Sequence, residues 1–189
     1  MTIKVRFAPS PTGFLHVGNI RAALINYLYA KKNNGEFFLR FDNTDIERTK
    51  EEYAKAIIED LKWLNIDYDP IYKQSDNLDR YEECKNKLIA ANRLYECYET
   101  QGDLNIQRKS QIASGQKPIY NRASLNLTKE QKQKFRDSGL KPYYRFLLED
   151  KKTSWDDKIK GKIIYEGRHF SDPVLIRENG SPTYTFCSV

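Results

Sequence analysis

Residues 6–19 read Arg6-Phe7-Ala8-Pro9-Ser10-Pro11-Thr12-Gly13-Phe14-Leu15-His16-Val17-Gly18-Asn19, and they join two segments of different periodicity. Residues 3–7 alternate apolar and polar side chains, which predicts a strand. After Gly18 the apolar residues recur at helical spacing up to Leu28, which predicts a helix. Residues 33–35, Asn-Asn-Gly, predict its end, and the apolar run at 37–41 predicts a second strand. The pattern indicates a βαβ unit.

The chemistry of this unit follows from the predicted helix start. Unpaired N–H groups and a partial positive charge at a helix N-terminus can hold phosphate. His16 and Asn19 are three residues apart, so both side chains reach the same face of the first turn. Gly18 lacks a Cβ and allows a flat ring or a backbone to come close. The alternative is that the Pro/Gly segment is an ordinary connection.

Ligands of parallel sheets bind at the carboxyl ends of the strands. The capping-box pattern Thr49-Lys50-Glu51-Glu52 predicts a second helix, up to Leu64, and therefore a right-handed parallel sheet with covering helices. Arg6 and Asp42 fall near the ends of the two strands, so they offer opposite charges to a ligand that has both a carboxylate and an ammonium. The alternatives are a structural Arg6 bonded to nearby carbonyls and an Asp42 that caps a helix or forms a turn.

The second half of the chain changes character. Residues 71–76 are predicted to leave the sheet domain, and a helix is predicted over 81–95, followed by a polar stretch over 100–117. The box Thr128-Lys129-Glu130-Gln131 predicts a basic helix that Gly139 ends, with either a solvated face or an RNA contact. Strands are predicted at 143–148, 159–165 and 174–177, and Asn179-Gly180 predicts a hairpin to a strand over 183–186.

Composition sets limits on partners and compartment. The 189 residues carry a net charge of +6, which suits a polyanionic partner,. The three cysteines, Cys84, Cys97 and Cys187, form no disulfide framework, which favours a reducing compartment,. No signal peptide or apolar run of spanning length appears. A soluble cytoplasmic protein with no membrane partner is expected.

Three motifs carry a resemblance to a known family. Residues 9–19 are similar to the first signature motif of class I aminoacyl-tRNA synthetases, in the form used by glutamyl-tRNA synthetases. Residues 39–45, Leu-Arg-Phe-Asp-Asn-Thr-Asp, resemble a second family segment, and residues 182–186, Pro-Thr-Tyr-Thr-Phe, resemble a third. The resemblance covers most of the chain and is weakest around residues 100–135.

The resemblance implies an α/β fold with a Rossmann-like parallel sheet. Its first half would occupy residues 1–76. An inserted α+β domain that binds the acceptor stem of tRNA would follow at 77–180, and re-entry into the catalytic domain would begin at 181–189. The family's second signature, a Lys-Met-Ser-Lys-Ser-like loop, and its anticodon-binding domain do not occur in the sequence. An N-terminal fragment that is inactive alone is therefore expected.

The resemblance also implies an activity and its residues. Glutamate would be activated by ATP to glutamyl-adenylate and then transferred to the 3′ end of tRNA. His16 and Asn19 would be catalytic, and L-glutamate would be bound by Arg6, Ser10, Asp42, Tyr184 and Ser188. The ATP site would comprise Pro9, Ser10, Pro11, Thr12, Gly13, His16, Val17, Gly18 and Asn19. Mg²⁺ would accompany ATP, and a monomer is expected.

The sequence departs from the family at several positions. Asp42 stands where relatives usually have Glu, and Asn43 where they have Asp. Some relatives carry a zinc knuckle in the insertion, but Cys97-Tyr98-Glu99 has one of the paired cysteines and residues 120–124 have none, so no structural zinc is expected,. Two alternatives stay open: a glutamyl-Q tRNA(Asp) synthetase-like enzyme, which glutamylates a modified base, and a non-catalytic tRNA-binding module.

Overall fold

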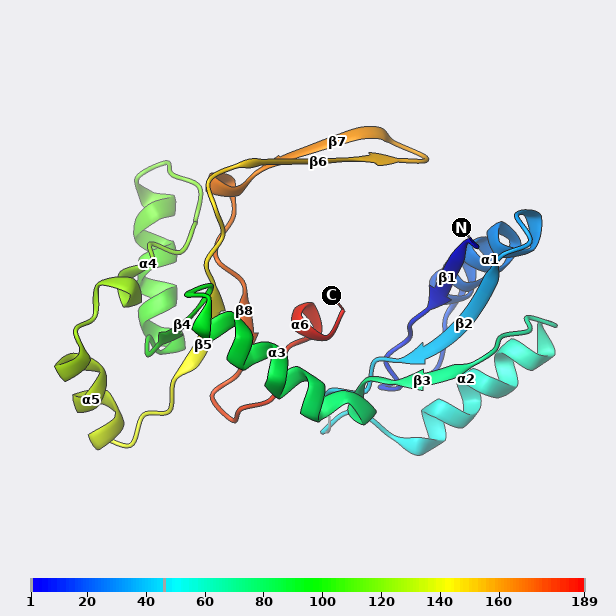
Figure 1. Cartoon of the computed structure of the whole chain (residues 1–189), viewed down its shortest axis with the longest axis horizontal. Coiled ribbons are helices and arrows are strands. Elements are labelled where there is room, and N and C mark those ends of the chain that lie inside the picture. The colour runs from blue at the N-terminus through cyan, green and yellow to red at the C-terminus, as the bar shows by residue number, and fades with distance from the viewer. Residues whose placement is uncertain (1, 46, 189) are drawn as a thin grey trace. The chain divides into compact units, whose positions relative to one another are not determined.

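A computed structural model describes residues 2–45 and 47–188. The chain divides into two compact units, residues 1–80 and residues 81–189. Each unit is described by itself below, with the labels of Figure 1.

The first unit contains a three-stranded parallel sheet in the order β1-β2-β3 (Figure 1). Its elements are β1 (Lys4–Phe7), α1 (Val17–Lys32), β2 (Glu36–Phe41), α2 (Glu51–Trp63), β3 (Ile71–Lys73) and the short 3₁₀ helix η1 (Gln74–Asn77). Phe7 lies opposite Leu39, and Leu39 lies opposite Ile71, so β2 is the central strand. The predicted strand–helix–strand–helix order and the parallel sheet are confirmed.

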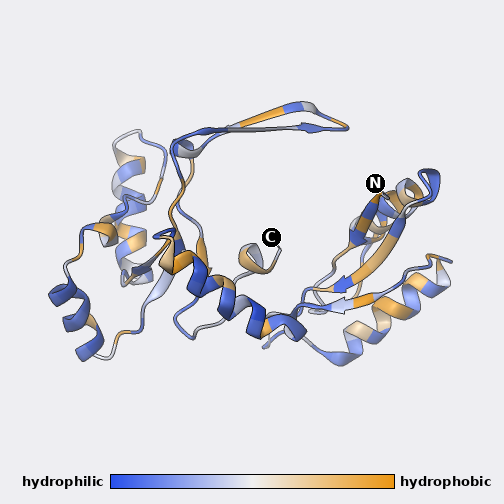
Figure 2. Cartoon of the chain, viewed as in Figure 1, coloured by the Kyte–Doolittle hydropathy of each residue, from blue (hydrophilic) through white to orange (hydrophobic). Residues whose placement is uncertain are grey.

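Alternation along β2 builds the core of this unit. Phe37, Leu39 and Phe41 are buried, and the residues between them are more exposed. Ile57 and Leu61, one helical turn apart on α2, are fully buried against the same cluster,. β2 is correspondingly apolar along most of its length (Figure 2). The sheet and its helices thus fix the strand ends from which the predicted site residues project.

The second unit contains an antiparallel sheet in the order β4-β5-β8 and a separate two-stranded ribbon, β6-β7. Its strands are β4 (Leu94–Cys97), β5 (Tyr143–Phe146), β6 (Lys152–Asp157), β7 (Gly161–Glu166) and β8 (Val174–Ile176). Its helices are α4 (Gln101–Ala113), α5 (Lys129–Asp137), α6 (Tyr184–Cys187) and the 3₁₀ turns η2 (Ala123–Asn126) and η3 (Gly167–His169). The helix α3 (Leu78–Ala90) begins in the first unit and continues into the second.

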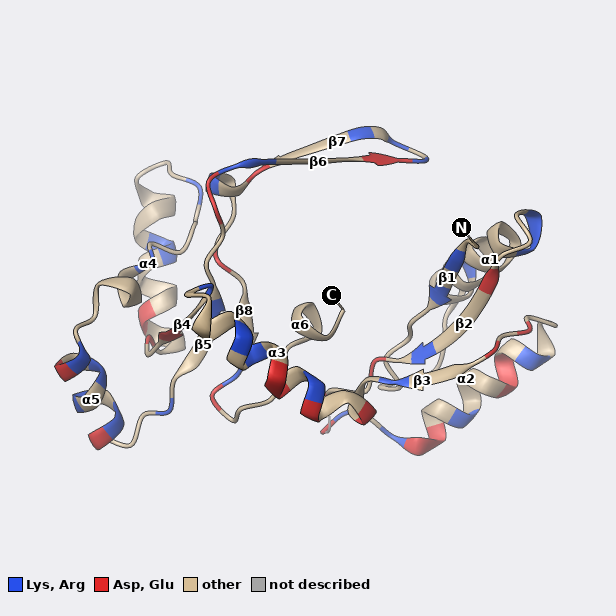
Figure 3. Ribbon diagram, in the orientation of Figure 1, with Lys and Arg blue, Asp and Glu red and all other residues tan. Residues whose placement is uncertain are grey.

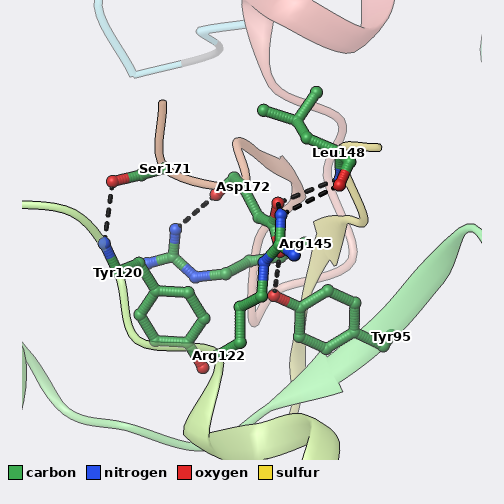
Figure 4. A network of polar contacts seen from close by, with 7 residues as sticks. All are labelled: Tyr95, Tyr120, Arg122, Arg145, Leu148, Ser171 and Asp172. Carbon is green, nitrogen blue, oxygen red and sulfur yellow. Dashed lines mark hydrogen bonds and ion pairs between the residues drawn. The ribbon is translucent and has the colours of Figure 1, made fainter. Parts of the chain in front are cut away.

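A buried aspartate joins several segments of the second unit (Figure 4). Asp172 is fully buried, and its Oδ1 accepts hydrogen bonds from Arg122 Nη2 and from the backbone N–H of Leu148, both at 2.9 Å. Its Oδ2 accepts from the Tyr95 hydroxyl at 2.7 Å, and its backbone carbonyl accepts from Arg145 Nη1 at 2.7 Å. Because every oxygen of Asp172 has a donor, burial of this charge is compensated.

The predicted cap of α2 and the predicted strand over 183–186 are wrong. No side chain caps α2, because its N-cap is Lys50, whose backbone N–H donates to Pro11 O at 3.0 Å. Thr49 Oγ1 is instead buried without a hydrogen-bond partner among the described residues. The predicted strand over 183–186 is also wrong, because Tyr184–Cys187 is helical. Pro182 has no N–H with which to extend a ladder, and the pairing stops at one Ile176–Pro182 bridge,.

Among the other predictions for the second half of the chain, those for α5 are confirmed, and several element boundaries are corrected. The Thr128–Gln131 capping box and the end of α5 near Gly139, whose φ is +85°, are confirmed. The prediction placed Tyr95 in the preceding helix, but α3 ends before Asn92, whose φ is +54°, and Tyr95 lies in β4. The polar stretch after residue 100 contains the helix α4, and residues 71–73 form the strand β3.

Candidate active site

The loop between β1 and α1 lies at the carboxyl end of the parallel sheet. The Asp42 backbone N–H donates to Pro9 O and the Lys50 N–H donates to Pro11 O, both at 3.0 Å. Pro11 is itself fully buried. The loop is therefore fastened to the segment that follows β2, which is where ligands of open α/β sheets bind.

His16 is the N-cap of α1, which places His16 and Asn19 at the start of the helix, as their spacing predicted. Its Nδ1 accepts the backbone N–H of Gly18 at 3.1 Å, and Asn19 Oδ1 accepts the backbone N–H of His16 at 3.1 Å. Since Nδ1 acts as the acceptor, the neutral imidazole carries its proton on Nε2. His16 Nε2–H and Asn19 Nδ2–H remain as donors in the first turn of the helix.

Gly18 is required by the position of the His16 ring. A Cβ at residue 18 would lie 2.9 Å from His16 Cε1 and 3.0 Å from Nδ1. The flat ring that this glycine admits is thus the imidazole of the N-cap itself. Any larger residue would displace His16 and open the cap.

Arg6 and Ser10 are both exposed beside this loop. Among residues 2–45 and 47–188, no hydrogen bond or ion pair engages the Arg6 guanidinium, so the bonded, structural alternative for this residue finds no support. A separate hollow of about 260 Å³ in this unit lies at the opposite, amino end of β2, beside Glu36. It therefore belongs to a different part of the sheet from the predicted site.

Asp42 is 4% exposed and has a partner that sequence analysis missed. Arg40 Nε donates to its Oδ1 at 2.7 Å and Arg40 Nη2 donates to its Oδ2 at 3.1 Å. Arg40 lies in β2 and Asp42 directly follows the last residue of that strand, and this spacing of two residues is the signal that could have identified the pair,. Asp42 can accept a further donor through its remaining lone pairs.

Asn43 holds the end of β2 to the segment after β3. Its Nδ2 donates to Ser75 Oγ at 2.9 Å and its Oδ1 accepts from the Ser75 backbone N–H at 3.0 Å. A carboxylate at residue 43 could accept both groups only with the Ser75 hydroxyl turned to donate. The Asn43 amide pairs with both Ser75 groups without placing a charge there. Asn43, which stands where relatives have Asp, thus has a structural role.

Tyr184 and Ser188 belong to the second unit. Tyr184 is the first residue of α6 and is 59% exposed. Ser188 Oγ is buried and has no hydrogen-bond partner among the residues described. Their roles as glutamate ligands stay predictions.

The residues around Cys97 form a hydrogen-bonded cluster. Glu99 Oε1 accepts the hydroxyls of Tyr120 at 2.7 Å and Ser124 at 2.8 Å, and its Oε2 accepts the Tyr143 hydroxyl at 3.2 Å. Burial acts to raise the pKa of Glu99, but these donors outweigh it and the pKa is lowered. Burial also raises the pKa of the Cys97 thiol to about 11, so the thiolate that a metal requires is disfavoured,.

Within the described residues, no three His, Cys, Asp or Glu side chains gather as a metal site. The same residues include no helix with the length and apolar character needed to cross a membrane.

The fold and the capped Pro/Gly loop agree with a comparison of the whole sequence with protein families. Residues 2–189 match the family described as tRNA synthetases class I (E and Q), catalytic domain. The chain therefore belongs to the catalytic-domain family of class I tRNA synthetases. The resemblance found in the sequence motifs and the expected Rossmann-like fold class are confirmed.

Similar proteins narrow this class. The chain is 58% identical over 187 residues to glutamate–tRNA ligase 1 of Rickettsia felis, covering 99% of this chain and 42% of that protein. It is 58% identical over 184 residues to the ligase of the same name from Rickettsia massiliae, covering 97% and 41%. The chain thus spans about two-fifths of the length of these relatives.

Solved structures agree with this result. A glutamate tRNA ligase from Elizabethkingia meningosepticum, in complex with its amino acid, superposes with a TM-score of 0.87 at 31% identity. The glutamate-tRNA synthetase from Elizabethkingia anophelis gives a TM-score of 0.88 at 31% identity. Each comparison covers 100% of this chain and 41% of the solved chain.

Proposed function

We propose that this chain supplies the ATP-binding and glutamate-binding part of a glutamate–tRNA ligase. The observation that carries the proposal is an exposed Arg6 in β1, the strand that leads into the capped start of α1, in a family whose similar members are glutamate–tRNA ligases. A guanidinium is the side chain best suited to bind a carboxylate through two parallel hydrogen bonds.

The reaction has two steps. A carboxylate oxygen of the α-carboxyl group of glutamate attacks the α-phosphorus of ATP, and pyrophosphate leaves. A hydroxyl of the terminal ribose of tRNA then attacks the acyl carbon, and AMP leaves. Chemistry of this kind depends on positioning and on stabilising developing negative charge.

His16 and Asn19 are the proposed catalytic residues. Their capping interactions orient Nε2–H and Nδ2–H at the start of α1, where they can donate to phosphate oxygens,. The segment Pro9–Gly13, with Val17 and Gly18, forms the backbone against which ATP is proposed to lie. Mg²⁺ is proposed to enter bound to the phosphates of ATP.

The amino acid is proposed to lie across the strand ends. Arg6 binds the side-chain carboxylate of glutamate, and Asp42 accepts the α-ammonium while Arg40 holds the Asp42 carboxylate in place. Ser10, Tyr184 and Ser188 are also proposed as glutamate-binding residues.

The polynucleotide substrate is assigned to the inserted region. Residues 77–180 are proposed to bind the acceptor stem of tRNA, which accords with the net charge of +6,. Lys and Arg are spread over α5 and over the β6-β7 ribbon (Figure 3). A monomer acting in the cytoplasm is part of the same proposal.

The test is an aminoacylation assay with the 189-residue chain and, where the reading frame is longer, with the full protein. We expect the full protein to attach glutamate to tRNA in the presence of ATP, and the chain alone to bind tRNA weakly without charging it. Turnover by the 189-residue chain would contradict the expectation that this chain binds tRNA without charging it. Glutamate activation with transfer only to a modified base would favour the glutamyl-Q type of enzyme. Failure of the full protein to activate glutamate would contradict both enzyme functions.

A further inference from the structure

A row of aromatic rings lies on one face of the β6-β7 ribbon. In the antiparallel register Thr153 pairs with Tyr165 and Trp155 with Ile163, so Trp155 and Tyr165 share a face,. Their rings stack at 5.2 Å between centroids with 13° between planes. Phe170, after η3, lies 5.2 Å from Tyr165. Trp155, Tyr165 and Phe170 are called the ring row below.

The ring row is more exposed than a packed core would leave it. Trp155 is 48% exposed, Tyr165 45% and Phe170 41%. Among the described residues, β6 and β7 pair only with each other, and Figure 1 shows the ribbon projecting from the second unit. A two-stranded ribbon has little stability of its own. Exposed aromatic patches of this kind mark sites that bind a ligand or a partner.

The ring row lines a hollow of about 440 Å³. Phe146 lines the same hollow, and the Arg93 guanidinium lies 4.7 Å from the centroid of the Phe146 ring. This volume falls in the range of pockets that hold small organic ligands. Four aromatic side chains therefore line the hollow.

The charged side chains that line the hollow or lie near its lining residues carry a net positive charge. Lys151 and Arg93 contact Glu149, and Lys152 and Arg168 contact Glu166, so each carboxylate faces two cations. Lys117 Nζ lies 5.6 Å from the Phe170 ring and has no carboxylate partner in the part of the chain that the structure describes. Asp150, near Arg168, makes three carboxylates against five cations. The excess charge suits an anionic ligand.

We propose that this hollow binds an unpaired nucleotide of RNA. The base stacks on the exposed rings of the ring row, and its phosphates lie toward Lys117 and Lys151. Stacking on exposed aromatic side chains with cations alongside is the recognition mode of single-stranded nucleic acid, because every base presents a flat face. The inference rests on the proposed function, because tRNA is the RNA that the proposed ligase would bind.

The binding assay uses tryptophan fluorescence. The sequence has two tryptophans, Trp63 and Trp155. Trp63→Phe therefore leaves Trp155 as the sole reporter. In the 189-residue chain we expect saturable quenching by a six-nucleotide single-stranded RNA of mixed sequence, and little quenching by the same sequence as a duplex. Equal quenching by the duplex, or saturation by an acidic peptide but not by RNA, would overturn the proposal.

Variants identify the ring row as the binding surface. Tyr165→Ala should raise the Kd for the hexanucleotide about 5- to 150-fold, the range measured for loss of a stacking partner. Ile164→Ala is the matched control, because Ile164 is 56% exposed on the other face of β7, and its Kd should be unchanged. Lys117→Gln, which leaves the rings intact, should lower the salt slope by about one.

The two proposals fail separately. The hexanucleotide assay requires neither ATP nor glutamate, so a protein that binds RNA here without charging tRNA would contradict only the proposed function. A protein that charges tRNA normally while Tyr165→Ala leaves the hexanucleotide Kd at its original value would contradict only the nucleotide site.

Discussion

Asn19 accepts a hydrogen bond from the backbone N–H of His16 at 3.1 Å, and the same histidine accepts from Gly18 through Nδ1. The two side chains proposed to contact ATP therefore also hold together the helix start that is proposed to bind phosphate. The structural roles and the proposed catalytic roles fall on the same residues, and a substitution must be chosen to separate them.

His16→Ala in the full protein should lower the rate of glutamate-dependent ATP–pyrophosphate exchange about 100- to 1000-fold, because one donor to developing charge is lost. It should also cost about 0.5–2 kcal/mol of stability through loss of the cap. His16→Asn is the matched control, since asparagine caps helices well but places its amide differently. Near-normal exchange by His16→Ala, with tRNA present, would rule out the catalytic role.

Arg6→Gln should reduce the preference for glutamate over glutamine about 5- to 150-fold, the equivalent of about 1–3 kcal/mol for an unpaired buried group. The control is Lys4→Gln, on the same strand face, where Lys4 pairs with Glu36 at the surface. Activation kinetics with both amino acids measure the ratio of catalytic efficiencies. If Arg6→Gln leaves that ratio unchanged, Arg6 does not read the side chain.

Asp42→Asn should weaken activation of glutamate and glutamine alike, because both carry the same α-ammonium. It should also destabilise the protein, by about 3–5 kcal/mol if the paired charge stays buried. Arg40→Gln separates the two effects, since it breaks the same ion pair and keeps the Asp42 carboxylate. We expect Arg40→Gln to lose stability in urea but to raise the KM for glutamate less than Asp42→Asn does, because the carboxylate that accepts the α-ammonium remains. An equal rise in KM for both variants would assign Asp42 a structural role.

Glu99→Gln should destabilise the second unit by about 1–3 kcal/mol, because three hydroxyl donors lose their charged acceptor. The folded pKa of Glu99 is lowered, so its contribution is present at neutral pH and is lost as pH falls through that value, below the usual 4.5,. Thermal unfolding between pH 3 and 7 should show a smaller acid dependence in Glu99→Gln. A variant curve parallel to the original would contradict this.

No structural zinc is expected at the same cluster, and a chelator tests that expectation directly. EDTA should leave the midpoint of thermal unfolding unchanged, because hydroxyls and not a metal compensate Glu99. A fall in the midpoint that added Zn²⁺ reverses would show that a metal is bound.

Local patterns predicted the first βαβ unit well, because alternation and helical spacing record which face is buried. The Thr128 cap was also readable, since its bonds are local. The strands β3 and β4 were missed, because residues 71–76 were assigned to the exit from the sheet and Tyr95 to the preceding helix, and the pairing of both strands comes from distant partners. The capping box of Thr100 and Asp103 was present in the sequence but lay in a stretch too polar to suggest a helix.

In the candidate site, too, features set by local spacing were predicted and features set by other contacts were missed. His16 and Asn19 could be placed in one turn from their spacing alone. The Arg40–Asp42 pair was missed because the aspartate was assigned to a ligand. The ring row was missed as well, since it depends on the register of β6 against β7 and on Phe170 beyond the ribbon.

Asp172, with donors from three separate segments, has a consequence for evolution. Removal of Tyr95, Arg122 or Asp172 alone leaves buried polar groups unsatisfied, so each single substitution meets a penalty that a second one could relieve,. The effects of substitutions at these three positions are therefore not additive, because the residues share hydrogen bonds. In descendants of this sequence, positions 95, 122 and 172 should change together or remain as they are, while the exposed residues of α5 drift one at a time.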